Sequence, residues 1–339
     1  MMNTELLKQD KVTVALGEIM LRLSPRGNLR FAQADELEVH YGGAEANVAA
    51  SLSLLGERTR FVTKLPAHDF GENALRFLQA NGVDTSRILR GGERIGTYFF
   101  ERGASQRGSR VIYDRKNSAF ALSSVQEYDF DYIFEEADFL HVSGITPALG
   151  GDCARLTETA ICEAKKRGMT VSFDPNYRAR LWAEDDAKAC FEKLLPHTDI
   201  LITSSDGLSV LGIKPTGEDA EATLSAAETL FKRYNLRAVA LTMRGHISAN
   251  ENRWTAVYYD GTGYVSNAYL LHIVDRVGGG DAFAAGLIYA LKQGFDGQKT
   301  INFATAAGAI KHTIEGDVNF ATKEEILALM NHPSGRVLR

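Results

Sequence analysis

Short apolar runs alternate with longer segments of helical periodicity along most of the 339-residue chain. The first run, Val12-Thr13-Val14-Ala15-Leu16, ends in a glycine and is typical of a buried parallel strand. Further strands are predicted at 60–63, 139–143, 171–174, 199–203, 238–243 and 254–259, and helices at 41–55, 72–80, 152–167, 218–234, 282–292, 300–313 and 323–330. This order predicts an α/β fold in which helices flank an open, mostly parallel sheet.

Two segments interrupt the alternation of strand and helix. Residues 19–24 and 29–31 surround a Pro-Arg-Gly-Asn turn, and residues 97–101 and 110–115 surround a polar, glycine-containing loop. Each pattern predicts a β-hairpin. We therefore expect a small β-sheet lid, formed by about 18–34 and 94–119, within a single domain that spans residues 12–331.

Tyr113 and Arg115 alternate onto one face of the second predicted hairpin, where they could meet a ligand. For the other arginines of this segment, Arg102, Arg107 and Arg110, a solvated face is the alternative. Another candidate is Arg178, which follows the predicted strand 171–174. Ligands bind at the carboxyl edge of an open parallel sheet, so Arg178 is a candidate anion ligand unless it is an exposed loop residue.

Composition narrows the class of protein. A net charge of −5 with 24% charged residues gives no broad basic surface, which argues against nucleic acid as a partner. Three cysteines without C-x-x-C spacing are typical of free thiols in a reducing compartment. No apolar run approaches membrane-spanning length, so we expect a cytoplasmic protein that does not enter a membrane.

The stretch from Asp275 to Gly286 carries the clearest chemistry. Three consecutive glycines, Gly278, Gly279 and Gly280, let backbone N–H groups converge on one point, and the following helix directs its positive dipole end there. This pattern predicts an anion hole for a phosphate. Asp281 places a carboxylate beside it, which indicates a proton acceptor or a metal partner. The alternative is a glycine-rich turn with Asp281 as the helix N-cap.

A second glycine pair precedes the predicted helix 41–55. Gly42 and Gly43 could allow close approach of a ligand, or they could serve tight packing of the helix on the sheet. No Walker A, dinucleotide-binding or zincin motif is present, which excludes P-loop kinases, simple dehydrogenases and zinc hydrolases.

These motifs resemble the ribokinase-like (PfkB) sugar kinases. The stretch 275–281 is similar to their D-T-x-G-A-G-D signature, with Arg276 in place of Thr and Gly279 in place of Ala. The resemblance implies that Asp281 is the catalytic base and that the three glycines hold the transferred phosphoryl group. Gly43 and Asn47 match the positions that contact sugar hydroxyls in the G-G-x-x-x-N-x-A motif.

The resemblance narrows to the 2-keto-3-deoxygluconate kinases, on the segments 17–25, 41–47, 113–115, 174–178 and 311–314. It implies ATP-dependent phosphorylation of the terminal hydroxyl of 2-keto-3-deoxygluconate. Arg115 and Arg178 would bind the substrate carboxylate, with Tyr98 and Tyr113 as hydroxyl or carbonyl contacts. Magnesium would arrive with ATP, and a monovalent cation is a further candidate cofactor. The implied nucleotide contacts are Thr242, Gly278, Gly280, Thr305 and Ala306.

Two positions depart from the family pattern. Thr203-Ser204-Ser205-Asp206 replaces the N-x-x-E motif that tunes magnesium binding, which leaves Asp206 as the candidate metal partner, through water. Thr305 stands where many relatives have an Asn near the adenine. Two rival functions stay open, a kinase for a neutral sugar or another keto-deoxy acid and a sugar-sensing binding protein. Exposed strand edges of the lid favour a homodimer or an assembly of dimers.

Overall fold

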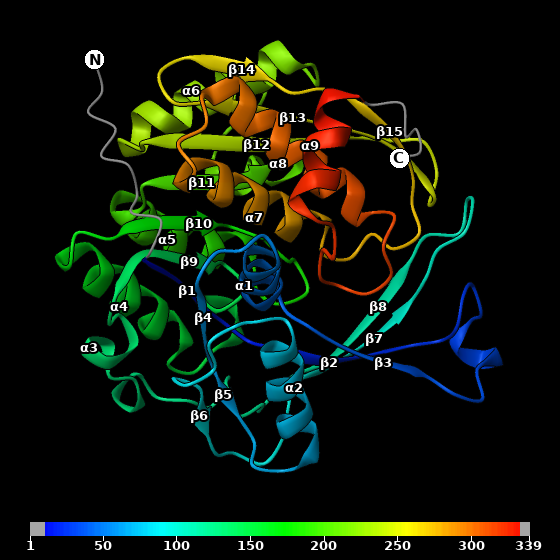
Figure 1. The fold of residues 1–339 in the computed structure, drawn as a ribbon, viewed down its shortest axis with the longest axis vertical. Helices are drawn as coiled ribbons and strands as arrows, with labels where there is room; N and C mark the ends of the chain where they lie inside the picture. The colour runs from blue at the N-terminus through cyan, green and yellow to red at the C-terminus, as the bar shows by residue number, and fades with distance from the viewer. Residues whose placement is uncertain (1–10, 333–339) are drawn as a thin grey trace.

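The computed structural model describes residues 11–332 and contains one large mixed sheet between two layers of helices (Figure 1). The strand order is β14-β13-β12-β11-β10-β9-β1-β4, with β15 beside β13. Strands from β12 to β4 in this order run parallel, β13 is antiparallel to β12, and β14 and β15 are each antiparallel to β13. The predicted open, mostly parallel sheet is therefore confirmed. Its strands are β1 (Val12–Leu16), β4 (Thr59–Val62), β9 (Ala137–Ser143), β10 (Thr170–Asp174), β11 (Ile200–Ser204), β12 (Ala238–His246), β13 (Glu251–Tyr259), β14 (Gly263–Val265) and β15 (Tyr269–His272).

Helices cover both faces of this sheet because its strands are apolar on both sides. In β9, Leu140 and Val142 enter the core on one face, whereas Phe139 enters the core on the other. The first face is covered by α3 (Phe130–Ile133), α4 (Cys153–Lys166), α5 (Glu184–Leu194) and α6 (Ala220–Tyr234). The second is covered by α1 (Ala44–Leu54), α7 (Gly279–Lys292), α8 (Gly297–Lys311) and α9 (Lys323–Asn331). Within the described residues, no helix is long and apolar enough to cross a membrane.

Local sequence sets several helix ends. The Asp219 side chain caps α6 by accepting from the Ala222 N–H, and Asn235 ends the same helix in the left-handed region. α7 and α8 approach closely at Gly286, where a Cβ would lie 2.9 Å from the Ala307 Cβ. A further helix, α2 (Asp69–Ala80), shares a hydrophobic cluster with the short strand β5 (Lys64–Leu65) and is joined to β6 (Leu89–Arg90) by the ion pair of Glu72 with Arg90.

A separate four-stranded sheet extends from the main body (Figure 1). Its order is β3-β2-β7-β8, with bounds β2 (Met20–Ser24), β3 (Glu38–Gly42), β7 (Thr97–Glu101) and β8 (Arg110–Asp114). The hairpin predicted at 97–101 and 110–115 is confirmed as β7 and β8. We call this sheet the lid, since it covers the cavity described below.

The other predicted hairpin is wrong. β2 pairs with β3, whereas residues 29–31 lead into a short 3-10 helix, Phe31–Gln33. The Phe31 N–H donates to Glu101 Oε2 at 2.9 Å and its ring packs edge-on against Phe99, so this segment crosses the lid instead of joining it as a strand. Residues 41 and 42, predicted as the start of a helix, belong to β3. Likewise, α7 begins at Gly279 and not at Ala282.

Candidate active site

The carboxyl ends of the parallel strands and the lid enclose a cavity of about 700 Å³. Glu18 follows β1, Ile145 follows β9, Arg178 follows β10 and Asp206 follows β11. Tyr98 and Tyr113 contribute from the lid. The cavity therefore lies where ligands bind in open α/β sheets, and its size suits a small molecule.

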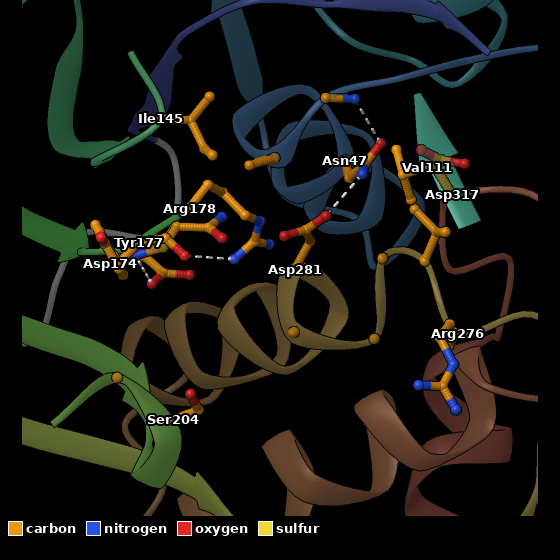
Figure 2. A pocket seen from close by; sticks show the side chains of 18 of the residues that line it. Asn47, Val111, Ile145, Asp174, Tyr177, Arg178, Ser204, Arg276, Asp281 and Asp317 are labelled. Carbon is orange, nitrogen blue, oxygen red and sulfur yellow. Dashed lines mark hydrogen bonds between the residues drawn. The ribbon is translucent and has the colours of Figure 1, made fainter. Parts of the chain in front are cut away.

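The N-terminus of α7 opens into this cavity (Figure 2). Gly278 caps the helix at φ 81°, and a Cβ there would lie 1.8 Å from the Asp317 carbonyl oxygen, so the position requires glycine. The Ala282 N–H makes the first helical bond, to the Gly278 carbonyl at 2.8 Å. The preceding N–H groups, at Gly279, Gly280 and Asp281, lack a partner inside the helix and carry its positive dipole end, as an anion hole requires.

Asp281 is the third residue of α7 and faces the cavity. Its Oδ2 accepts from Asn47 Nδ2 at 2.7 Å, and Asn47 Oδ1 accepts from the Gly43 N–H at 3.3 Å. Gly278 is the N-cap, so the alternative that Asp281 caps the helix is wrong. Burial raises the pKa of Asp281 to about 6, opposed by the Asn47 hydrogen bond and by the charge of Arg178, while Asp317 adds to the rise.

Tight packing accounts for the glycine pair before α1. A Cβ at Gly43 would lie 2.0 Å from the Glu18 carbonyl oxygen, and one at Gly42 would lie 2.2 Å from Asp317 Oδ2. Gly43 also lines the cavity together with Asn47. Packing thus explains both glycines, and Gly43 is in addition part of the cavity wall, where a ligand could approach it.

The two predicted carboxylate ligands differ in their surroundings. Arg178 is exposed and extends toward Asp281 in Figure 2, with Nη1 donating to the Tyr177 carbonyl oxygen at 3.1 Å. Arg115 is buried, and its Nε donates to Glu18 Oε2 at 2.8 Å in an ion pair. Both line the cavity. Arg178 is therefore the freer of the two guanidinium groups, while Arg115 is held in place by Glu18.

A buried charge cluster lies beside the N-terminus of α7. Arg22 donates from Nη2 to Asp275 Oδ2 and from Nη1 to Asp317 Oδ1, both at 2.6 Å. The Tyr98 hydroxyl donates to Asp317 Oδ2. Because Arg22 belongs to β2 of the lid, this cluster joins the lid to the loop that carries the glycines.

Sequence reasoning missed several residues of the cavity wall: Glu18, Asp174, Arg244 and Asp317. The Arg244 guanidinium lies over the Trp254 ring, and its Nη2 is 3.9 Å from where a Cβ of Gly280 would be. Arg244 follows Thr242 at the end of the parallel part of β12, so its strand-end position is a signal that could have indicated it. Burial, with the charge of Asp281, raises the pKa of Asp174 to about 7.

The nucleotide contacts implied by the resemblance fall into two groups in the structure, one on the cavity wall and one in the core. Thr242 lines the cavity with Gly278 and Gly280, as do Thr203 and Asp206. Thr305 and Ala306 are fully buried in α8. The Thr305 hydroxyl donates to the Ile301 carbonyl at 2.7 Å and its own carbonyl accepts from Trp254 Nε1 at 3.0 Å, so these two positions belong to the core instead of the cavity wall.

The comparisons with known proteins agree with this geometry. Residues 11–327 match the model of the pfkB family carbohydrate kinases, and the chain belongs to this family. The 2-dehydro-3-deoxygalactonokinase of Haloferax volcanii is 33% identical, over 92% of this chain and 94% of that protein. A crystal structure of 2-dehydro-3-deoxygluconokinase from Thermotoga maritima is 45% identical, with a TM-score of 0.93 over 95% of this chain and 98% of that one. A putative ribokinase II from E. coli, solved with ATP and Mg²⁺, shares the fold at 23% identity and a TM-score of 0.80, over 95% of this chain and 99% of that one.

Proposed function

We propose that this kinase transfers the γ-phosphoryl group of ATP to the terminal hydroxyl of 2-keto-3-deoxygluconate (2-dehydro-3-deoxygluconate), giving the 6-phosphate. One observation carries the proposal: Asp281 lies in the first turn of α7 and faces Arg178 in the same cavity. A base beside a phosphoryl site accounts for a kinase, and a cationic group across the cavity accounts for an acidic acceptor.

The Asp281 carboxylate would accept the proton of the attacking hydroxyl as the oxygen bonds to phosphorus and the bond to the leaving ADP oxygen breaks. Asn47 holds Asp281 Oδ2 and so fixes the direction of the carboxylate. The N–H groups of Gly279 and Gly280 would stabilise negative charge on the transferred group, and Arg244 lies close enough to Gly280 to add a positive charge.

The acceptor carboxylate would bind Arg178, whose guanidinium can donate two parallel hydrogen bonds. Arg115 would contribute the donors that Glu18 leaves free, with Tyr113 lining the same wall. The Tyr98 hydroxyl already donates to Asp317, so we propose its oxygen as an acceptor for a substrate hydroxyl.

Asp174 and Asp206 fit magnesium that arrives with ATP. Among the cavity carboxylates, Glu18, Asp281 and Asp317 are engaged by Arg115, Asn47 and Arg22, respectively. Asp206 and Asp174 supply the remaining carboxylate oxygens, although Asp174 Oδ1 also accepts from the Asn176 N–H at 2.9 Å, and Mg²⁺ in kinases uses one or two carboxylates with phosphate oxygens and water. The bound ion would offset phosphate charge during transfer.

A coupled assay of ADP release tests the proposal. The acceptors are 2-keto-3-deoxygluconate, its galactonate-derived epimer, ribose and fructose, with each phosphorylated product verified by mass spectrometry. We expect the highest kcat/KM for the gluconate-derived acid. A preference for the epimer would mean that the substrate is 2-dehydro-3-deoxygalactonate, for which the Haloferax volcanii kinase is named. Preference for ribose or fructose would refute the acidic acceptor and support the neutral-sugar kinase.

We further propose a cytoplasmic homodimer that joins through the outer face of the lid. Leu23 pairs with Val39 and Phe99, and Phe99 pairs with Ile112, so four apolar side chains form one row across the sheet. Val39 and Ile112 are 54% and 40% exposed. A second copy would cover this row by symmetry. Sedimentation velocity should give a dimer for the native chain and a monomer for Ile112→Glu, and a monomeric native chain would refute the interface.

The free thiols of Cys153, Cys162 and Cys190 suit the reducing cytoplasm, which cell fractionation would test.

A further inference from the structure

A buried lysine lies directly behind the anion hole. Lys311 is the last residue of α8, and its side chain is fully buried. Its ammonium donates to the Ile314 carbonyl oxygen at 3.0 Å and to the Asp275 carbonyl oxygen at 3.4 Å. A buried ammonium carries a large desolvation cost, so a lysine held mainly by backbone carbonyl groups needs an explanation.

Those two carbonyl groups belong to the loops that shape the anion hole. Asp275 begins the loop that ends at Gly278, the cap of α7, and Ile314 lies in the loop that leads from α8 to Asp317. The loops are joined by further bonds. The Val274 N–H donates to the His312 carbonyl at 2.8 Å, and the Gly316 N–H donates to Asp275 Oδ2 at 3.2 Å. The ammonium of Lys311 therefore lies between two loops whose relative position sets the anion hole.

Three carboxylates act on Lys311. Arg22 and Lys311 supply two positive charges, which offset the negative charges of Asp275 and Asp317 in the buried cluster, and the carboxylate of Asp281 in the cavity adds a further negative charge. Burial lowers the pKa of Lys311, and the three carboxylates oppose this effect. Without Lys311 the cluster would have excess negative charge immediately behind a site that must receive phosphate. The cluster thus requires a second cation at this point.

We propose that the Lys311 ammonium is a built-in cation that makes this kinase independent of monovalent metal ions. The family resemblance allows such an ion as a cofactor, and backbone carbonyl oxygens are typical ligands of K⁺. Here the carbonyl groups of Asp275 and Ile314 already bind an ammonium group of the same charge. The residues beside the anion hole therefore do not fit an added K⁺. Lys311 is a positioning residue, since it acts on phosphate through the two loops and through its charge.

Cation titration of the native enzyme is the first test. Phosphorylation of the best acceptor is measured in tetramethylammonium salts, which are then replaced by KCl, NaCl or NH₄Cl at constant ionic strength and constant Mg²⁺. We expect the same kcat and KM for ATP in all four salts. A rate that depends on K⁺ in the native enzyme would overturn the proposal, and this result needs no variant.

Variants of Lys311 sharpen the test. Lys311→Ala opens space for an ion, and we expect kcat to fall by about a hundredfold, the size of the loss of one anion-hole group, and to recover partly with K⁺ or methylammonium. Lys311→Met fills the same space without charge, so its loss should not be rescued. Lys292→Ala is the matched control, because Lys292 is equally buried but bonds Thr13 and Asp138 away from the cavity. It should show no cation response.

Thermal unfolding gives a readout that does not depend on catalysis. At constant ionic strength, K⁺ should raise the Tm of Lys311→Ala and leave the native chain and Lys292→Ala unchanged. A folded Lys311→Ala variant that responds to no cation, in rate or in Tm, would contradict the proposal. This inference rests on the kinase function proposed above. If no acceptor is phosphorylated, the function proposal fails, while the Tm measurements still decide whether Lys311 replaces an ion.

Discussion

Replacing Asp281 by Asn should separate activity from stability. Asn keeps an oxygen that can accept from Asn47 Nδ2, so the side chain can stay where the structure has it. It has no basicity, however, and loss of a positioned general base lowers turnover by roughly 10²–10⁴. We expect that fall in kcat with the best acceptor, measured by ADP release, with little change in KM for ATP.

The same substitution should stabilise the protein at neutral and alkaline pH. Burial raises the pKa of Asp281 from 3.8 to about 6, so the ionised carboxylate costs folding free energy above that pH. The shift corresponds to at most about 3 kcal/mol, and solvent in the cavity should reduce this to about half. Below the unfolded-state pKa both states are protonated, so the gain of the Asn variant should disappear there.

Urea unfolding of both proteins at pH 8 and pH 3 measures this difference. Asp260→Asn is a suitable control, because the pKa of Asp260 is also raised by burial although it lies in the turn after β13, outside the set of residues that line the cavity. Its turnover should match that of the native chain. A variant Asp281→Asn with near-native turnover would refute the base assignment. A variant that is inactive and also less stable at pH 8 would show that the carboxylate has a structural role.

Four further outcomes are expected. Arg178→Ala should raise KM for the keto acid about ten- to a hundredfold and leave KM for ATP unchanged, since hydrogen bonds to a charged group contribute roughly 1.5–3 kcal/mol. An equal rise in KM for fructose would contradict this prediction. The Arg115→Ala variant should unfold at a lower urea concentration than the native chain, because the substitution leaves Glu18 buried without its ion-pair partner. Gly280→Ala, where a Cβ would make only an ordinary contact, 3.9 Å from Arg244 Nη2, should fold normally and lose about 10²–10³ in kcat, whereas Gly278→Ala should fail to fold, as circular dichroism would show.

The parts of the site that sequence reasoning found are those with local signals. Gly278 and Asp281 stand in one glycine-rich turn, Gly43 and Asn47 are four residues apart, and Arg178 follows a strand end. Each of these patterns needs only neighbouring residues to be recognised. The parallel sheet was likewise predictable, because its strands are continuous apolar runs.

Glu18 and Asp317 were missed because they depend on contacts between distant segments. Arg22 and Asp317 are 295 positions apart, and Glu18 and Arg115 are 97 apart, so no local pattern reveals either ion pair. The prediction of a hairpin over residues 19–31 was wrong for a related reason. Strand β2 finds its partner at 38–42, beyond an intervening segment that is held by Glu101 from another strand.

Arg178 links substrate recognition to the strength of the base. Its positive charge lowers the pKa of Asp281 and of Asp174 in the free enzyme. A substrate carboxylate bound to Arg178 would compensate that charge, so the pKa of Asp281 would rise and the carboxylate would become a better proton acceptor when the acceptor is in place. A neutral sugar would leave Arg178 uncompensated. The acid limb of kcat should therefore lie at higher pH for the keto acid than for fructose, and the acid limb of kcat/KM, which reports the free enzyme, should lie near pH 6 for both. Coincident kcat limbs would show that Arg178 does not act on the base.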